Sequence, residues 1–217
     1  MYYPLMLDVR GRLAVVIGGG AVAERKVGTL LAYGARVRLI SPEITQRLMQ
    51  YAQDGLIEVH QRAYRPGDLD EAFLVFAATN QSEVNRQVYH EAVQRGQLVN
   101  VVDRPEWSLF HVPSTLRRGR LQISISTAGA SPAMARRIRK QLEKQFDDWY
   151  AGYLDWLAEL RGELQWLIPD SGKRRMAYQM FAEEEAWLEK YRREGHERTL
   201  QEARQWIGEW LRGNHLG

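Results

Sequence analysis

A run of small residues near the start of the chain has the composition of a phosphate-binding turn. The apolar stretch Leu13–Ile17 stops at three glycines and is followed at once by residues that favour a helix. Small residues spaced G-x-G-x-x-A permit a tight turn, a close approach of a pyrophosphate and close packing of the new helix. Phosphates would lie at the helix N-terminus, where free N–H groups favour anions. We predict a dinucleotide site, in preference to an ordinary glycine-rich turn, at Gly18, Gly19 and Gly20, with Ala23 as the last small residue.

The residues after the next apolar strand should face the ribose of that dinucleotide. An acidic residue about 20 positions beyond the glycines is the ribose ligand in NAD sites. Here Glu43 comes slightly late for this role, and the Ser41 hydroxyl is the alternative hydrogen-bonding group. No basic cluster follows the strand, which favours NAD over a cofactor with a 2′-phosphate.

Two more polar segments follow apolar strands. Because ligands of a doubly wound sheet bind at the carboxyl ends of its strands, Thr79 and Asn80 should face the cofactor. An ordinary polar turn is the competing interpretation. Asp103 emerges at the same edge and could accept a proton as a hydride leaves the substrate, or steer a metal ion. Its alternatives are a helix cap or a salt bridge to Arg104 or Arg118.

Histidine and cysteine usage limits the metal chemistry. The chain has no cysteine, which excludes disulfides and thiolate ligands. No two histidines have metal-ligand spacing, so we expect no permanent zinc or iron site. His111 lies eight residues after Asp103 and either approaches the same pocket or is buried and hydrogen-bonded. The full set is His60, His90, His111, His196 and His215.

Positive charge is concentrated in one segment. Residues 114–144 contain 8 Lys and Arg but one acidic residue, whereas residues 1–113 are balanced and residues 145–217 are acidic. Within this segment Arg136, Lys140 and Lys144 recur every four residues, on one face of an expected helix. Such a face meets solvent, an acidic partner or a polycarboxylate ligand. Nucleic acid is less favoured, since no nucleic-acid-binding motif accompanies the charge.

Alternating strands and helices must position these groups. This order predicts a Rossmann-like, doubly wound parallel sheet of the α/β class over residues 1–113. A glycine directly follows each of the three predicted helices, and glycine at this position is a typical helix stop signal. The expected strands are Leu13–Ile17, Arg36–Ile40, Ile57–Gln61, Leu74–Ala78 and Leu98–Val102, and the expected helices are Ala21–Tyr33, Glu43–Asp54 and Ser82–Arg95.

The pattern changes after Pro113. Residues 114–150 should form a small segment with a half-exposed strand, Leu121–Ser126, and a helix that begins at Ser131-Pro132. The apolar stripe of that helix continues to Leu167, with Gly152 and Gly162 as places where it could bend or break. Residues 151–217 should form a helical domain, with a helix over Lys173–Arg193 and a last helix preceded by a capping box of Thr199 and Glu202. Its tryptophans should fill helix contacts, in preference to lining a planar ligand.

Four ordered motifs together resemble the siroheme synthase family. They are Gly18-Gly19-Gly20-Ala-Val-Ala-Glu-Arg-Lys26, Ala77-Ala78-Thr79-Asn80, Asn100-Val-Val-Asp103 and Ser131-Pro-Ala-Met-Ala-Arg136. The resemblance covers about residues 1–150. Within the family, the chain is similar in character to the stand-alone precorrin-2 dehydrogenases, some of which also insert iron.

This resemblance implies the following assignments. NAD⁺ would take a hydride from precorrin-2 to give sirohydrochlorin, with Asp103 in the acid–base role. The segment after the nucleotide domain would form a homodimer. The substrate carries eight carboxylates, for which the positive segment is suited. Further ligands implied by the family are Ala21 and Val22 for the pyrophosphate, Pro42 with Glu43 for the ribose, and Ser126, Thr127, Arg136 and His111 for the substrate.

Two other functions remain open from the sequence. One is a dehydrogenase that is also a sirohydrochlorin ferrochelatase, and the other is a nucleotide-sensing or nucleic-acid-binding module without catalysis. No apolar run approaches the length of about 20 residues that a membrane span needs. The N-terminus also lacks a secretory pattern, so we expect a cytoplasmic location.

Overall fold

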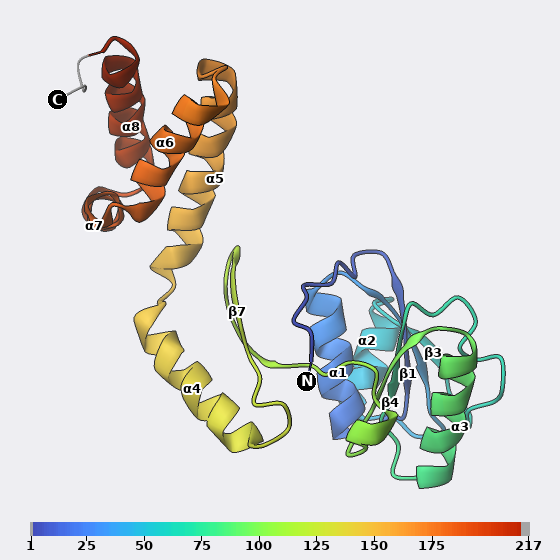
Figure 1. The fold of residues 1–217 in the computed structure, drawn as a ribbon. Helices are drawn as coiled ribbons and strands as arrows, with labels where there is room; N and C mark the ends of the chain where they lie inside the picture. The colour runs from blue at the N-terminus through green and yellow to red at the C-terminus, as the bar shows by residue number, and fades with distance from the viewer. Residues whose placement is uncertain (1, 214–217) are drawn as a thin grey trace. The chain divides into compact units, whose positions relative to one another are not determined.

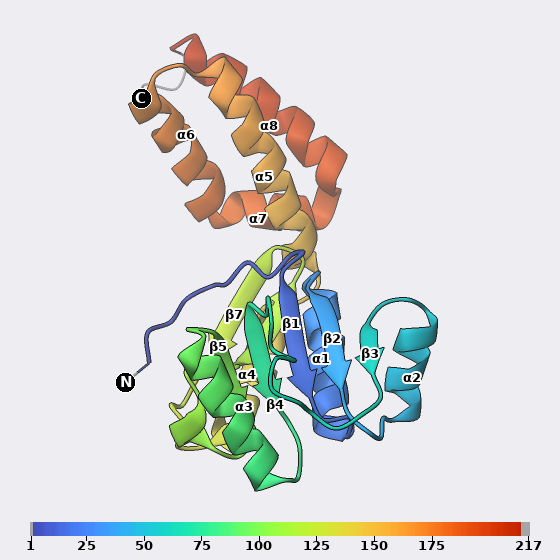
Figure 2. The same ribbon diagram turned by 90° about the vertical axis from the view of Figure 1, so that its right-hand side faces the viewer.

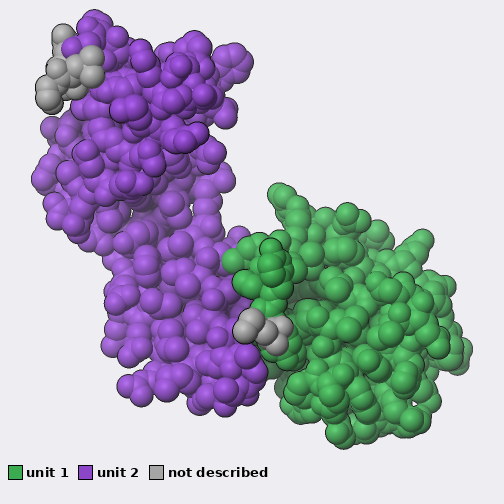
Figure 3. All heavy atoms as spheres, in the orientation of Figure 1, with its two compact units in different colours: residues 1–112 green, residues 113–217 purple. Residues whose placement is uncertain are grey.

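The computed structural model describes residues 2–213. The chain divides into two compact units, residues 1–112 and residues 113–217, whose described residues Figure 3 shows in green and purple. The first unit contains the glycine turn and the parallel sheet, and the second contains the basic segment and the helices that follow.

A five-stranded parallel sheet forms the centre of the first unit (Figure 1). Its order, β3-β2-β1-β4-β5, reverses direction between β1 and β4, as in a doubly wound fold. The predicted Rossmann-like fold is therefore confirmed. The strands are β1 Leu13–Ile17, β2 Arg36–Ile40, β3 Glu58–His60, β4 Leu74–Ala77 and β5 Leu98–Val101.

Helices cover both faces of this sheet, as Figure 2 shows. Alternate residues of β1 point to opposite faces, so Val16 packs with α1 and α2 while Val15 packs with α3. Both side chains are completely buried, which explains why β1 is apolar throughout. The helices are α1 Ala21–Ala32, α2 Gln46–Gln53 and α3 Ser82–Gln94, and a 3₁₀ turn, η1, spans Pro105–Trp107.

The start of α2 differs from the prediction. The helix begins at Gln46 and not at Glu43, because Thr45 is its N-cap and accepts a hydrogen bond from the Leu48 N–H at 3.3 Å. The Thr45 hydroxyl also donates to Glu24 of α1 at 2.6 Å. Glu43 therefore lies in the loop beside the glycine turn, where its side chain is exposed.

The second unit begins with an antiparallel hairpin that the sequence predicted only in part. Strand β6 Ser114–Arg118 pairs with β7 Leu121–Ile125. Five helices follow, and α4 begins at the predicted position, with the Ser131 side chain accepting from the Met134 N–H at 3.2 Å. The helices are α4 Pro132–Gln145, α5 Trp149–Leu167, α6 Ser171–Glu183, α7 Glu185–Glu194 and α8 His196–Leu211.

Three helix boundaries in this unit were predicted wrongly. The long helix breaks between Gln145 and Trp149, and neither Gly152 nor Gly162 interrupts α5. The expected helix over 173–193 is two helices, because Glu184 adopts an extended conformation. Thr199 is inside α8 and not at its cap, since its hydroxyl donates to the Gly195 carbonyl one turn earlier at 2.7 Å.

Aromatic side chains form the core of the helical region. Trp156 is fully buried, and its ring stacks on Tyr153 and on Trp187. Trp206 and Trp210 pack against the same cluster, which confirms that tryptophans fill helix contacts here. Trp166 is the exception, with 89% of its surface exposed.

Candidate functional site

The carboxyl ends of four strands lie side by side at one edge of the sheet. Backbone hydrogen bonds connect Gly18 N–H to Ile40 O, Ala78 N–H to Ile17 O, and Val102 N–H to Ala77 O, at 2.8–2.9 Å. The turns after β1, β2, β4 and β5 are therefore held together there. This edge is where doubly wound sheets bind ligands, and it is called the sheet rim below.

The three glycines occupy structurally different positions at the sheet rim. Gly18 has a φ of +114°, and a Cβ on it would come within 2.4 Å of the Ala78 carbonyl oxygen. A Cβ on Gly19 would come within 2.0 Å of the Glu43 carbonyl oxygen. A Cβ on Gly20, in contrast, would meet nothing within 4 Å. Gly18 and Gly19 are thus required by the fold, whereas Gly20 faces open space.

The N-terminus of α1 presents backbone N–H groups to that open space. Gly20 is its N-cap residue and makes no side-chain cap, whereas Thr45 caps α2 and Ser131 caps α4. Ala21 is exposed and Val22 is half-buried at this end of α1. An uncapped N-terminus beside an open glycine fits a phosphate group, because both the unsatisfied N–H groups and the helix dipole favour anions.

The loop after β2 carries the residues predicted for the ribose. Ser41 is only 6% exposed, and its hydroxyl donates to the Glu43 carbonyl at 2.6 Å. This contact shapes the loop over Gly19. The side chains of Pro42 and Glu43 are exposed, so the Glu43 carboxylate is the accessible acceptor at this point of the rim.

Thr79 is held in place by a buried residue that the sequence analysis missed. Asn85 of α3 is 5% exposed; its amide donates to the Thr79 carbonyl at 2.9 Å, and its carbonyl oxygen lies 2.8 Å from the Thr79 hydroxyl. Asn80 is exposed beside them. Asn85 lies one turn before Val88 on the buried face of α3, and a polar residue on an apolar stripe was the signal that could have revealed it.

We expect Asn85→Ala to weaken cofactor binding through the Thr79 loop. The change removes the buried partner of the Thr79 backbone and hydroxyl, which should cost about 1–3 kcal/mol of unfolding free energy. The KM for the dinucleotide should rise several-fold because the loop loses its fixed conformation. Gln87→Ala, an exposed change on the same helix, is the control for urea denaturation and steady-state kinetics. Equal KM values for the two variants would contradict the assignment.

Asp103 follows β5 at the sheet rim and has an uncommon backbone conformation. Its φ is +59°, which an aspartate adopts more readily than most residues. The side chain is exposed, and no hydrogen bond or ion pair to it is found within residues 2–213. The alternatives considered from the sequence do not apply, since Arg104 pairs with Glu106 and Arg118 pairs with Asp148. The carboxylate is therefore free to act on a ligand.

His111 lies eight residues after Asp103, beyond the turn η1. Its ring is exposed and lies 4.3 Å, centroid to centroid, from the ring of Tyr2. The expectation that His111 is buried is wrong. His215 lies outside the described residues.

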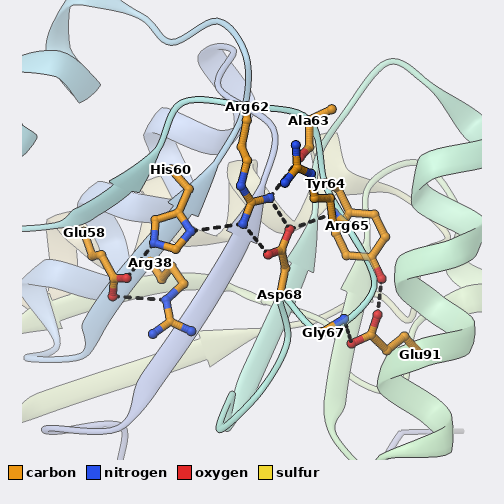
Figure 4. A network of polar contacts seen from close by, with 10 residues as sticks. All are labelled: Arg38, Glu58, His60, Arg62, Ala63, Tyr64, Arg65, Gly67, Asp68 and Glu91. Atoms are coloured by element: carbon orange, nitrogen blue, oxygen red, sulfur yellow. Dashed lines mark hydrogen bonds and ion pairs between the residues drawn. The ribbon is translucent and has the colours of Figure 1, made fainter.

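A network of charged residues lies on and after β3, near the loop that follows β2 (Figure 4). Arg62 forms two hydrogen bonds to the Asp68 carboxylate, at 2.6 and 2.7 Å, and Arg38 pairs with Glu58 at 3.0 Å. The Arg62 hydrogen bonds lower the pKa of the Asp68 carboxyl. Both half-buried arginines of this network are therefore neutralised by carboxylates of the protein itself.

The residues implied for the substrate loop belong to the second unit. Thr127 closes the loop before α4, since its hydroxyl accepts from the Ser131 N–H and donates to the Ser131 carbonyl, both at 3.1 Å. The Ser126 hydroxyl accepts from the Ala128 N–H at 3.1 Å and is otherwise exposed. Thr127 thus has a local structural role, while Ser126 stays accessible.

The predicted basic face of α4 lines an open hollow of about 470 Å³. Arg136 is exposed within it. In contrast, Arg139 of the same helix is half-buried and pairs with Glu143. Positive charge on one side of a hollow attracts anions. The lining residues are Ala133, Arg136, Arg137, Lys140, Gln141 and Lys144.

Residues 2–213 contain neither a metal-binding cluster nor a membrane-spanning helix. No group of three or more His, Asp or Glu side chains in this range is placed to hold a metal ion. Within the same range, no helix combines the length and apolar character needed to cross a bilayer.

Comparison with known proteins decides the family. Residues 5–114 match a family described as "Putative NAD(P)-binding". The chain belongs to this family. Residues 118–145 match a second family, described as "Sirohaem biosynthesis protein central", and this range contains all of β7 and α4. The resemblance to siroheme synthases stated from the four motifs is thereby confirmed.

Individual relatives in the siroheme synthase family match most of the chain. The siroheme synthase of Nitrosococcus oceani is 36% identical over 178 residues, which are 82% of this chain and 38% of that protein. The siroheme synthase of Photorhabdus laumondii is 42% identical over 142 residues, which are 65% of this chain and 30% of that protein. The chain thus spans less than two fifths of the length of these relatives.

A solved structure matches nearly the whole chain. It is described as "SirC, precorrin-2 dehydrogenase", is 28% identical in sequence and has a TM-score of 0.78. The match covers 94% of this chain and 100% of that one. The helical region is therefore part of the shared fold.

Proposed function

We propose that the protein is an NAD-dependent dehydrogenase that oxidises precorrin-2 to sirohydrochlorin. The observation that carries this proposal is the match to the solved precorrin-2 dehydrogenase, which extends over all of that chain. The siroheme synthase relatives support the same pathway. The free Asp103 carboxylate at the sheet rim adds a chemical group suited to the reaction.

The sheet rim fits a dinucleotide. The N–H groups of Ala21 and Val22 would hold the pyrophosphate, and Gly20 would admit it because a Cβ there would meet no atom of the described residues within 4 Å. Glu43, with Pro42 beside it, would bind the ribose hydroxyls, while Ser41 holds the loop. Gly18 and Gly19 would shape the turn, and Thr79 and Asn80 would border the nicotinamide side.

Charge at the ribose side favours NAD over NADP. Glu43 presents a carboxylate, which would repel a 2′-phosphate. The nearby Arg62 is held by Asp68 and Arg38 by Glu58, so neither guanidinium is free to bind that phosphate. We expect kcat/KM with NAD⁺ to exceed that with NADP⁺ by at least about tenfold, a difference of 1.4 kcal/mol. Equal values would contradict this assignment.

Asp103 is assigned the proton transfer. The bound nicotinamide supplies the hydride acceptor for the oxidation. As the substrate loses a hydride, a carbon–hydrogen or nitrogen–hydrogen bond becomes acidic, and the Asp103 carboxylate accepts that proton as a general base. Because its side chain is exposed and free, it can approach a ligand without first breaking a contact within the protein.

The remaining residues are assigned to the substrate. Ser126 and Arg136 would bind carboxylates of the macrocycle, Thr127 would fix the loop that presents Ser126, and the exposed His111 would also contact the substrate. We also propose a cytoplasmic homodimer that assembles through residues 114–150, with residues 151–217 as a helical C-terminal domain. Sedimentation equilibrium would test the dimer.

The turnover assay tests the main proposal. Purified protein mixed with precorrin-2 and NAD⁺ should form NADH and sirohydrochlorin, followed at their separate absorption bands. Absence of turnover by a folded protein that binds NAD⁺ would reject the proposal. Salt-sensitive DNA binding without NADH formation would favour the binding-module alternative.

A second activity is iron insertion into sirohydrochlorin. The exposed carboxylate of Asp103 and the exposed ring of His111 favour it, since both groups could remove pyrrole protons as the metal substrate enters. An anaerobic assay with Fe²⁺ or Co²⁺ and sirohydrochlorin, without NAD⁺, should show metal insertion if the chain is bifunctional.

A further inference from the structure

Lys26 of α1 is a half-buried cation without a carboxylate partner. Three cationic side chains of the first unit are half-buried: Arg38, Arg62 and Lys26. Glu58 and Asp68 neutralise the two arginines. For Lys26, in contrast, no ion pair or hydrogen bond of the side chain is found within residues 2–213.

The Lys26 ammonium lies over an aromatic surface. Its Nζ is 5.3 Å from the ring centroid of Phe76 in β4, and the Phe76 ring packs edge-on against Phe110. Burial lowers the pKa of Lys26, and the like charge of Arg25 lowers it further. A cation–π contact offsets a part of this desolvation, but a carboxylate would offset more.

The position of Lys26 relates it to the proposed reaction. Phe76 pairs in register with Asn100 of β5, and Asn100 precedes Asp103 by three residues. Phe76 is the second-last residue of β4 and Asn100 the second-last residue of β5, so the residue beneath Lys26 lies about one strand residue, or about 3.3 Å, from the sheet rim that Asp103 follows. A macrocycle that presents carboxylates around its rim is large enough to reach both groups.

We propose that Lys26 binds a peripheral carboxylate of the tetrapyrrole substrate and is a specificity-determining residue for polyacidic macrocycles. This inference rests on the proposed function. The half-buried Phe110 ring, which packs edge-on against the buried Phe76 ring, would contribute an apolar surface beside the bound carboxylate. The Asn100 side chain stabilises this arrangement, because its amide donates to the Phe110 carbonyl at 3.0 Å.

The test uses uroporphyrin, a tetrapyrrole with eight carboxylates that cannot undergo the dehydrogenation. Fluorescence titration of the full chain should show that Lys26→Met raises the Kd for uroporphyrin about 10- to 100-fold, the loss expected for one charged hydrogen bond. Methionine retains an unbranched apolar chain over Phe76 and removes only the charge. Lys26→Arg should restore most of the affinity.

Arg25→Met is the matched control, because it removes one positive charge from the neighbouring, exposed position of the same helix. Its Kd for uroporphyrin should stay within about twofold of the unmodified protein, a difference below 0.5 kcal/mol. The Kd for NAD⁺ and the melting temperature should be unchanged in Lys26→Met. With precorrin-2, the KM should rise and kcat should change little.

The outcomes separate this inference from the proposed function. If the unmodified protein turns over precorrin-2 and Lys26→Met keeps its KM and its uroporphyrin affinity, the Lys26 assignment is wrong and the dehydrogenase proposal stands. If Lys26→Met instead has both a lower melting temperature and a higher Kd for NAD⁺, the role of Lys26 is structural and the assignment is also wrong. If the unmodified protein shows neither turnover nor uroporphyrin binding, both proposals fail.

Discussion

Asp103→Asn should lower kcat for precorrin-2 oxidation by about 10²- to 10⁴-fold, the contribution of a general base. The amide cannot accept the proton, but it has nearly the size of the carboxylate. Asparagine also tolerates the φ of +59° at this position. We therefore expect an unchanged melting temperature and an unchanged Kd for NAD⁺, measured by differential scanning fluorimetry and isothermal titration calorimetry.

Two companion variants separate chemistry from conformation. Asp103→Gly should relieve the positive φ and be at least as stable as the original protein, yet be equally inactive. Glu106→Gln removes another exposed carboxylate of the same segment and should retain activity. Near-normal kcat in Asp103→Asn would remove this residue from the mechanism, as would a similar loss of activity in Glu106→Gln.

The sequence predicted the parallel sheet well because its central strands β1 and β4 are apolar and buried along their whole length. All five residues of β1 are buried, and the glycine turn follows the strand directly. The edge strand β3 is shorter than predicted, since only Glu58–His60 pair with β2. Strand β6 was missed for a related reason. Only Leu116 is buried in the polar run Ser114–Arg118, so pairing with β7 defines the strand and the side-chain pattern does not.

Helix ends were harder to predict wherever the apolar stripe continued through a break. The stripe runs without interruption from α4 into α5, yet the Asp147 carboxylate accepts a hydrogen bond from the Trp149 N–H at 3.3 Å and starts a new helix. The apparent capping box at Thr199 failed because a threonine hydroxyl can also bond to the carbonyl one turn earlier inside a helix. Local hydrogen bonds determine these helix boundaries, and the spacing of apolar residues in the sequence does not reveal those hydrogen bonds.

Candidate site residues that are buried or half-buried within helices could not be predicted from the sequence. The positions of Gly20, Glu43, Thr79 and Asp103 at strand ends follow from topology, and the sheet brings the strand ends together. Asn85 and Lys26 lie within helices, where a polar residue ordinarily implies a solvated face. The roles proposed for them rest on what surrounds them, Thr79 in one case and Phe76 in the other, and these contacts depend on the packing of the helices on the sheet.

Gly20→Ala should abolish tight cofactor binding while leaving the fold intact. Gly20 has φ −84° and ψ −173°, which alanine adopts without strain, and the added Cβ meets no protein atom within 4 Å. The melting temperature should therefore change by less than about 3 °C. The same methyl group would occupy the space assigned to the pyrophosphate, so the Kd for NAD⁺ should rise by about 100-fold, or 2.7 kcal/mol.

Gly18→Ala is the matched comparison, because it adds the same methyl group two residues earlier. There the Cβ would lie 2.4 Å from the Ala78 carbonyl oxygen, and the φ of +114° excludes alanine without strain. We expect a loss of at least about 3 kcal/mol of unfolding free energy, measured by urea denaturation. If Gly20→Ala binds NAD⁺ normally, the pyrophosphate does not lie against Gly20. If Gly20→Ala instead unfolds as Gly18→Ala does, the space beside Gly20 is not open, and a loss of NAD⁺ binding there would reflect the fold and not the ligand.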